Sequence, residues 1–412
     1  MTAVDLQKTG SAPEPPSGHV PPSGMAQLRS ALRSNVRQYG MILALLLIVL
    51  LFTVLTDGIL LRPLNVTNMI QQNSYILILA IGMVMVIIAG HIDLSVGSLA
   101  AFTGAAAAVM TVNAGVPWPL AVAICIVGGA VFGAWQGFWI AYVGIPSFIV
   151  TLAGMLLFRG GTQILLQGQS VAPFPTGFQK ISTGFLPAVG PNTDYHNITL
   201  LLGLAVIVVV IVQERRRRTQ SLLHGFDVLP VAFWVAKLAA IVVAIVLFTL
   251  TLASYQGAPI VLLVLAALLI AFSFVMRTTV WGRHVYAIGG NEAAARLSGV
   301  KSKGVTFGVF VAMGALSALA GLVYAARLNA GTPQAGINFE LEAIAAAFIG
   351  GASASGGVGT VLGAIIGGLV LGVLNNGMSL IGVGTDYQQV IKGLVLLAAV
   401  GLDVYNKRRL GT

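Results

Sequence analysis

The sequence contains few charged residues. Of its 412 residues only 8% are Asp, Glu, Lys or Arg, whereas 57% are hydrophobic. Soluble globular domains carry about 25% charged residues, so this chain has too little polar surface to cover a fold in water. The low charge excludes an ordinary soluble protein and indicates one that folds in a lipid bilayer.

Cysteine and the common catalytic motifs are also missing or scarce. Cys125 is the only cysteine, which excludes an internal disulfide and a cysteine-based metal site. The chain has no G-x-x-x-x-G-K-[ST] phosphate loop, no H-E-x-x-H zinc motif and no plausible pair of nucleophile and base. We therefore expect no enzymatic activity, no cofactor and no metal.

What the chain does contain is long apolar runs. They extend over about 20 residues, which suits helices that cross a bilayer, and they are not the short alternating strands of a membrane β-barrel. Fifty glycines fit close packing between such helices. We predict an all-α, polytopic membrane bundle of about 12 helices (10–12). The predicted spans are 40–57, 74–90, 94–112, 119–142, 146–166, 198–212, 229–252, 259–277, 305–326, 341–354, 358–376 and 386–403.

Two predicted spans, 74–90 and 341–354, are short for a bilayer and predict broken or tilted helices. Residues 1–38 are rich in Pro, Gly and Ser and predict a disordered cytoplasmic tail. A single membrane domain is expected over 39–409. The segment 167–197 is expected to be an external loop, serving either as a connector or as a contact for an extracytoplasmic partner.

The positions of Lys and Arg predict the orientation. Sixteen of these 22 residues lie in the N-terminal tail and in the segments on the same side of the membrane, four lie on the opposite side, and two lie within spans. Because positive residues concentrate on the cytoplasmic side, both termini are expected inside. The net charge of +10 is spread over four separate segments with no single basic face, so we do not expect nucleic acid as a partner.

A polar stretch, Trp281–Gly304, interrupts two apolar runs on the predicted cytoplasmic side. Asn291 is a good N-cap, Glu292 suits the positive end of the helix dipole, and Gly299 suits a C-terminal cap. These signals predict a helix of about two turns within 291–299. Such a helix is marginal alone in water, so it packs either on a cytoplasmic partner protein or on anionic lipid headgroups.

A second polar segment follows the span at 74–90. Asp93 either caps the next helix or lines a pathway at a break in the membrane. Ser95 and Ser98 follow it closely. Near the last external turn, Asn375 and Asn376 either line a polar mouth or are solvated. These five residues are the candidate pathway residues.

Small residues dominate Ala346–Gly377, where they serve either close helix packing or contact with a ligand. Ser95–Leu99 ("SVGSL") and Gly357–Val361 ("GVGTV") resemble each other weakly, as in an old duplication or by chance. The acids Glu340 and Glu342 precede a span, where capping is the default interpretation.

Two classes of function fit these observations. One is a channel or an ion-coupled secondary transporter, which usually has ionisable residues inside its spans. Here Lys237, Lys392, Asp403 and Asp93 are the candidates. The other is the membrane subunit of a pump whose energy comes from a separate cytoplasmic protein, which would explain both the short polar helix and the missing nucleotide motif.

Four segments in order resemble the permease subunits of bacterial ABC importers for monosaccharides, the ribose, xylose and arabinose permease family. They are "GMVMVIIAGHIDLSVGSLAAFTG", "PSFIVTLAGMLLFRG", "GRHVYAIGGNEAAARLSGV" and "ELEAIAAAFIGGASASGGVGTVLGAIIGGLVLGVLNNGMSL". Within the family the chain looks most like xylose-type or multiple-sugar permeases, with an extra pair of spans around Arg215–Arg218.

The resemblance implies a type II ABC importer-like fold in the bacterial inner membrane. It implies a second copy of the chain, a cytoplasmic ATPase that hydrolyses ATP, and a periplasmic sugar-binding protein. The loop before the last spans would hold the coupling helix that docks on the ATPase. Carried over to this sequence, the coupling residues are Gly290, Asn291, Glu292, Ala294, Arg296 and Leu297.

Overall fold

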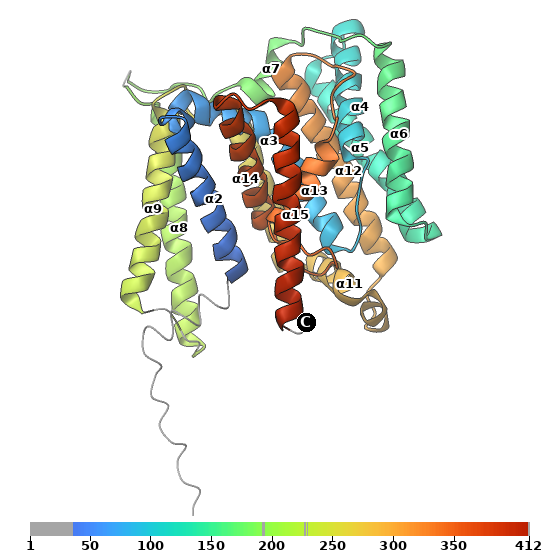
Figure 1. Ribbon diagram of the computed structural model, residues 1–412. Coiled ribbons are helices and arrows are strands. Elements are labelled where there is room, and N and C mark those ends of the chain that lie inside the picture. Colours follow the sequence, from blue (N-terminus) through green and yellow to red (C-terminus); the bar gives the residue numbers. More distant parts are fainter. Residues whose placement is uncertain (1–35, 192–193, 226–227, 229, 411–412) are drawn as a thin grey trace, which may run out of the picture.

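A computed structural model describes residues 36–191, 194–225, 228 and 230–410. Most of the predicted N-terminal tail, residues 1–35, lies outside the described residues. Within them the protein is a bundle of helices lying side by side (Figure 1), with only two isolated β-bridges, Val171–Gly331 and Phe185–Pro259. The predicted all-α membrane bundle is confirmed.

Each of the twelve predicted spans coincides with a helix. The helices are α2 (Val36–Leu55), α3 (Pro63–Ile88), α4 (Val96–Ala108), α5 (Trp118–Phe138), α6 (Ser147–Leu166), α8 (Asn197–Leu223), α9 (Val231–Ala253), α10 (Ile260–Thr278), α12 (Ser302–Leu328), α13 (Phe339–Ile349), α14 (Val361–Leu380) and α15 (Thr385–Leu410). Among the described residues, nine helices are long and apolar enough to cross a membrane, and α2 adds a shorter apolar stretch, Gly40–Leu55. One-turn π-helices, η2 (Val109–Asn113) and η3 (Trp139–Val143), extend α4 and α5.

The two spans that were predicted to be short have different outcomes. The predicted short span at 74–90 is wrong, because α3 begins at Pro63 and has 26 residues. The first half of α3 contains polar side chains such as Asn65, Gln71 and Asn73. A prediction from hydropathy alone therefore did not include this half in the helix. The other short span is confirmed, since α13 has only 11 residues.

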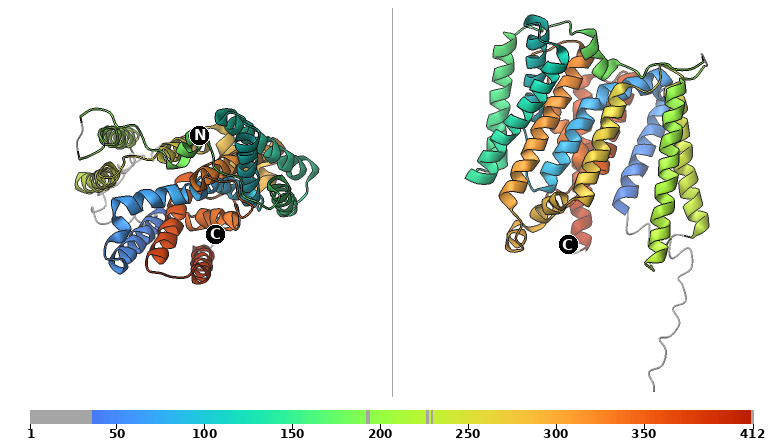
Figure 2. Two further views of the ribbon diagram at one scale, coloured as in Figure 1. Left: turned by 90° about the horizontal axis from the view of Figure 1, so that it is seen from above. Right: turned by 180° about the vertical axis from the view of Figure 1, so that it is seen from behind.

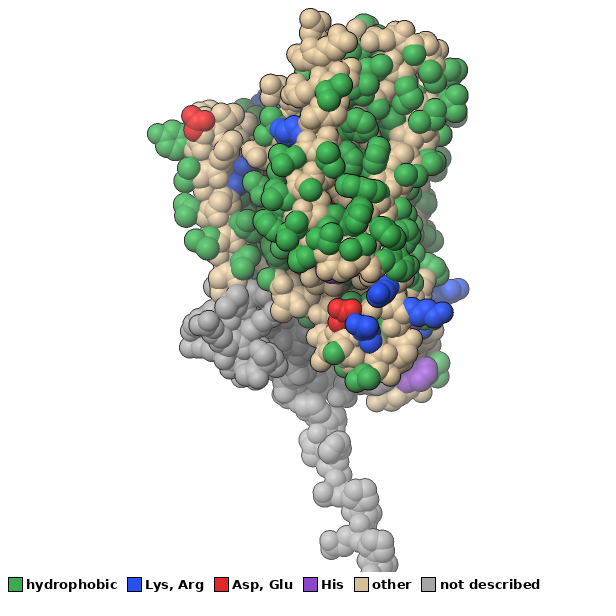
Figure 3. Space-filling view, turned by 90° about the vertical axis from the view of Figure 1, so that its right-hand side faces the viewer, with side chains coloured by type: hydrophobic (Ala, Val, Ile, Leu, Met, Phe, Trp, Pro, Cys, Tyr) green, Lys and Arg blue, Asp and Glu red, His purple; other side chains and the backbone are tan. Residues whose placement is uncertain are grey.

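The remaining helices lie at the two ends of the bundle. A short helix α7 (Thr176–Thr183) stands within the predicted external loop, and α11 (Val280–Leu297) lies at the opposite end. We call these the α7 end and the α11 end. The first residues of α2 and the last residues of α15 lie at the α11 end (Figure 1). On the face shown in Figure 3, a hydrophobic band covers the helices, and most of the Lys and Arg side chains gather below it at the α11 end.

Helix α3 forms the centre of the bundle. It packs against α10, α12, α13 and α14, and its residues 76–88 are almost entirely buried. Its side chains join those of α10, α12 and α13 in the largest hydrophobic core cluster. A central helix is surrounded by protein on every side, so its polar groups meet helix partners and not lipid.

The bundle repeats one packing pattern twice with opposite direction. Helix α3 packs on α12, α13 and α14, and in the same way α12 packs on α3, α4 and α5. The contact between α4 and α6 likewise matches the contact between α13 and α15. The helices α3–α6 therefore correspond to α12–α15, as in the inverted repeats of many transporters. The weak match between "SVGSL" and "GVGTV" does not follow this correspondence, because the first opens α4 and the second leads into α14.

The two short helices of the repeat, α4 and α13, meet at their N-terminal ends. A Cβ atom on Gly97 of α4 would clash with the carbonyl oxygen of Gly336 and with the carboxylate of Glu340 in α13. Gly336 has a positive φ of 75° and in turn lies against the backbone of Gly97. Only glycine permits backbones to approach this closely.

Helices α8 and α9 form a hairpin that stands at the edge of the bundle (Figure 2). The two helices pack mainly on each other, with α9 also touching α3. Their lipid-exposed faces are apolar, and α8 continues beyond the predicted span, through Arg215–Arg218, to Leu223.

Candidate functional site

Helix α11 contains the predicted short helix as a separate second half. The backbone breaks at Asn291, whose φ and ψ of −159° and 100° are not helical. The Asn291 side chain accepts a hydrogen bond from the Ala294 amide at 3.0 Å, as an N-cap does. At the other end, Gly299 has a φ of 87° and the Val300 amide donates to Ala295 at 3.0 Å. The predicted capping of this helix is confirmed.

The predicted coupling residues lie on the surface at the α11 end. Gly290, Asn291, Glu292, Ala294, Arg296 and Leu297 are all exposed. Leu297 is 92% exposed, whereas Ala295 is buried against the bundle.

The first half of α11 lies against two other parts of the bundle. The Tyr286 hydroxyl donates to the Gly359 carbonyl at 2.8 Å, and the Gly357 amide donates to the Ile88 carbonyl at 2.9 Å. Gly289 lies so close to Ile88 that a Cβ atom would clash with its carbonyl oxygen. The exposed helix is therefore joined through Val280–Gly290 both to the end of α3 and to the non-helical segment between α13 and α14.

A hollow of about 520 Å³ opens beside the exposed helix. Its lining includes His91, Ser147, Glu292, Arg296 and Lys303. Burial lowers the pKa of His91, and the nearby Glu292 carboxylate opposes this effect. Burial in this hollow therefore disfavours the charged form of His91.

The structure places three of the candidate pathway residues in the protein interior at the start of α4. The Asp93 carboxylate accepts hydrogen bonds from the Ser95 amide at 2.8 Å and the Ser95 hydroxyl at 2.7 Å, and Gln136 donates to Ser95 at 2.8 Å. The prediction that Asp93 caps α4 is wrong, because the N-cap is Ser95 and no side chain caps it; Asp93 closes the turn just before the helix. Ser98 is fully buried and its hydroxyl has no hydrogen-bond partner.

The other two candidates lie near the α7 end and do not meet the first group. The Asn376 side chain exchanges hydrogen bonds with Asn65 of α3, at 2.8 and 3.0 Å. The side-chain oxygen of Asn375 is buried without a partner. Asn376 thus joins α14 to the start of α3, which is a packing contact between helices.

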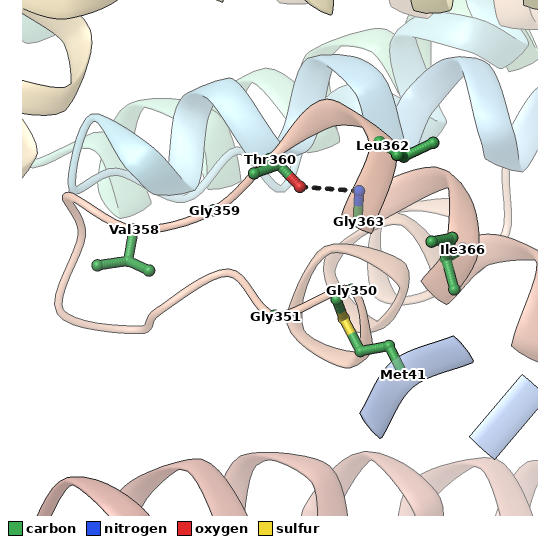
Figure 4. A pocket seen from close by; sticks show the side chains of 9 residues that line it. All are labelled: Met41, Gly350, Gly351, Val358, Gly359, Thr360, Leu362, Gly363 and Ile366. Atoms are coloured by element: carbon green, nitrogen blue, oxygen red, sulfur yellow. Dashed lines mark hydrogen bonds between the residues drawn. The ribbon is translucent and has the colours of Figure 1, made fainter. Parts of the chain in front are cut away.

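The small residues of Ala346–Gly377 bring α13 and α14 into contact. A Cβ atom on Gly350 would clash with the Gly363 carbonyl, and one on Gly367 with the Ala346 carbonyl. The connecting segment surrounds an apolar hollow of about 150 Å³, which Met41 of α2 also lines (Figure 4). Thr360 caps α14 by accepting from the Gly363 amide at 2.9 Å. These contacts support close packing as the role of the small residues.

Sequence reasoning did not pair two ionisable residues that the structure brings together. Lys392 of α15 donates to Glu342 of α13 at 2.9 Å, and both side chains are largely buried. The Tyr75 hydroxyl of α3 lies next to the same carboxylate. The available signal was that Lys392 is one of two cations inside a predicted span, where a charge needs a partner.

Comparison with known proteins identifies relatives over almost the whole chain. Residues 65–400 match the family described as "Branched-chain amino acid transport system / permease component". The xylose transport system permease protein XylH of Haemophilus influenzae is 43% identical over 377 residues, which cover 91% of this chain and 98% of that protein.

Two further relatives come from Escherichia coli K12. Its XylH is 43% identical and covers 92% of this chain and 95% of its own length. Its ribose import permease protein RbsC is 35% identical and covers 84% and 86%. No solved structure matches the chain significantly. The chain belongs to the branched-chain amino-acid transport system permease family and is a multi-pass membrane protein.

Proposed function

We propose that this chain is the membrane-spanning subunit of an ATP-driven importer for monosaccharides, with D-xylose as the preferred substrate. The relatives named for xylose transport match 91% and 92% of the chain and are more similar to it than the one named for ribose. Transport proceeds by alternating access, in which the packed helices have two arrangements and a partner biases one of them.

The observation that carries the proposal is the exposed, capped helix at the α11 end. In this account the α11 end is cytoplasmic, both termini are inside, and residues 291–299 dock in a cleft of a separate ATPase. Leu297 supplies an apolar anchor, while Glu292 and Arg296 supply charges of both signs. A few anchors of this kind carry most of the binding energy in protein interfaces.

The attachment of α11 suggests how force reaches the pathway. A push on the exposed helix moves Val280–Gly290, which contacts the end of α3 at Ile88 and the α13–α14 connection at Gly357 and Gly359. Helix α3 is the centre of the bundle, so its displacement alters contacts with both halves of the repeat. A second copy of this chain would complete the pathway, and a periplasmic sugar-binding protein would deliver the sugar at the α7 end.

Co-purification with the ATPase subunit tests the docking site. We expect Glu292→Ala/Arg296→Ala and Leu297→Asp to reduce the bound ATPase at least tenfold. Arg277→Ala is the matched control, since Arg277 is exposed in the last turn of α10 at the same end but outside the helix. Full ATPase binding and normal ATP-driven uptake in the docking variants would reject this assignment.

An ion-coupled secondary transporter is the second candidate, because Glu342 and Lys392 form an ion pair between helices of the bundle. Ionisable groups in membrane spans are common in proton relays. Sugar uptake into liposomes that contain this chain alone, driven by a proton gradient, would favour this candidate. Such uptake would also show that transport does not require an ATPase docked on the exposed helix at the α11 end.

A further inference from the structure

A pocket between α13, α14 and α15 is distinct from the surface around α11. It has a volume of about 230 Å³. Its polar lining consists of Asn338, Glu342, Gln389 and Lys392, and the remainder is apolar, including Leu341 and Leu371. Drug-sized ligands occupy pockets of about 300 to 1,000 Å³, so this pocket suits a smaller molecule.

The ion pair at this pocket is unusual in its position. Glu342 lies in the first turn of the short helix α13, and Lys392 lies about two turns into α15, between the apolar side chains Ile391 and Leu394. The Glu342 side chain is 16% exposed and that of Lys392 is 24% exposed, and the two join at 2.9 Å. A buried ion pair contributes little net stability compared with apolar packing, which favours a functional reason for placing charges here.

An aromatic group stands behind the Glu342 carboxylate. The rings of Tyr75 and Phe339 lie 4.2 Å apart, and Tyr324 meets both at 5.0 and 4.9 Å. The Tyr75 hydroxyl is next to the carboxylate. These aromatic side chains cover Glu342 on the side of α3 and α12, and Glu342 lines the pocket on its other side.

We propose that this pocket binds the monosaccharide during its passage, an inference that rests on the proposed function. Glu342 and Lys392 neutralise each other, yet the carboxylate retains lone pairs and the ammonium retains N–H donors. The amides of Asn338 and Gln389 add both donors and acceptors. This set matches the hydroxyl groups of a neutral sugar, and the leucine side chains match its C–H face.

The same chemistry disfavours an amino acid. A zwitterionic ligand would direct its carboxylate to Lys392 and its ammonium to Glu342, and it would have to separate a pair held at 2.9 Å. Opening this pair is a cost that a neutral sugar, which leaves the pair joined, does not incur. The pocket therefore distinguishes a sugar from the branched-chain amino acids that give the family its name.

The test uses the complete importer, with its ATPase and binding protein, reconstituted in liposomes. Uptake of radiolabelled D-xylose, D-ribose and leucine and the rate of ATP hydrolysis are measured together. We expect Glu342→Gln and Lys392→Met to lower xylose uptake at least tenfold while ATP hydrolysis changes less than twofold. Gln389→Leu keeps the ion pair, and we expect it to lower xylose uptake three- to tenfold and to alter the ratio of xylose to ribose.

Lys237→Met is the matched control, because it breaks the ion pair with Glu214 at 3.0 Å in the outer hairpin. We expect it to change uptake less than twofold. Uptake within twofold of wild type in all three pocket variants would overturn the inference and leave the proposed function intact. Full recovery of uptake in the exchanged pair Glu342→Lys/Lys392→Glu would also overturn it, because the pair would then act only as a link between helices. Import of leucine and no sugar by the wild type would overturn both proposals.

Discussion

Helices α3 and α8 have almost the same length, 26 and 27 residues, and both are apolar enough to cross a bilayer, but their surroundings are opposite. In its most apolar 18-residue window, α3 is 89% buried within the protein, whereas α8 is 11% buried. The outer helix α8 also has the higher mean hydropathy in this window, 2.2 compared with 1.7 for α3. In this protein, the more hydrophobic helix is the one that faces lipid.

The difference follows from what each helix touches. Lipid offers no hydrogen bonds, so a lipid-facing stretch such as residues 200–212 of α8 has no polar side chains. A central helix can include polar groups where a neighbouring helix or its own backbone satisfies them, as Asn376 does for Asn65 and the Met69 carbonyl does for Asn73. The polar first half of α3 thus marks a helix surrounded by protein.

The largest effect is expected where central helices touch through glycine. A Cβ atom on Gly321 of α12 would clash with the carbonyl oxygen of Ala100 in α4. We expect Gly321→Ile to reduce the yield of monodisperse protein at least tenfold, since overpacking costs about 3 kcal/mol or more here. Gly160→Ile in α6 is the control, because nothing lies within 4 Å of its Cβ position. Equal loss in the control would contradict the packing account.

A cavity in α3 should have a smaller but clear effect. Ile78 is fully buried, whereas Leu201 on α8 is 66% exposed. We expect Ile78→Ala to lower the free energy of unfolding by about 2 kcal/mol or more and Leu201→Ala to leave it nearly unchanged. Unfolding in detergent, followed by circular dichroism, provides the measurement. A comparable loss from Leu201→Ala would place α8 in a protein contact.

The asparagine pair tests the polar half of α3. Hydrogen bonds between membrane helices contribute about 0.6 kcal/mol on average and up to about 1.7 kcal/mol, so we expect Asn376→Leu to cost about 1 kcal/mol. The double variant Asn65→Leu/Asn376→Leu should recover part of this loss, because no unpaired amide remains. A double-mutant cycle on unfolding measures the coupling, and strict additivity would show that the two side chains act independently.

The smallest effect is expected in the outer hairpin. Lys237 is 39% exposed and pairs with Glu214 near the end of α8. Exposed ion pairs contribute about 0 to 1 kcal/mol, so Lys237→Met should change the free energy of unfolding by less than about 0.5 kcal/mol. A loss above about 1 kcal/mol in the same unfolding assay would mean that the hairpin contributes to the core.

Periodicity and charge predicted the helical class and a helix at each of the twelve apolar runs, because lipid imposes a strong constraint on hydropathy. Capping chemistry predicted the helix after Asn291, since its signals are local. The start of α3 at Pro63 was missed, because the sequence of a segment does not show which other helices will bury its polar side chains. The Glu342–Lys392 pair and the meeting of Gly97 with Gly336 join residues far apart in the chain, and no local pattern records them.

ATP-dependent uptake of D-xylose into liposomes containing this chain, its ATPase and the binding protein tests the account most directly. We predict uptake that requires ATP and all three proteins, that falls at least tenfold with Glu292→Ala/Arg296→Ala, and that is retained with Arg277→Ala. Uptake that proceeds without the ATPase, or that is unaffected when the exposed helix of α11 is altered, would contradict the account.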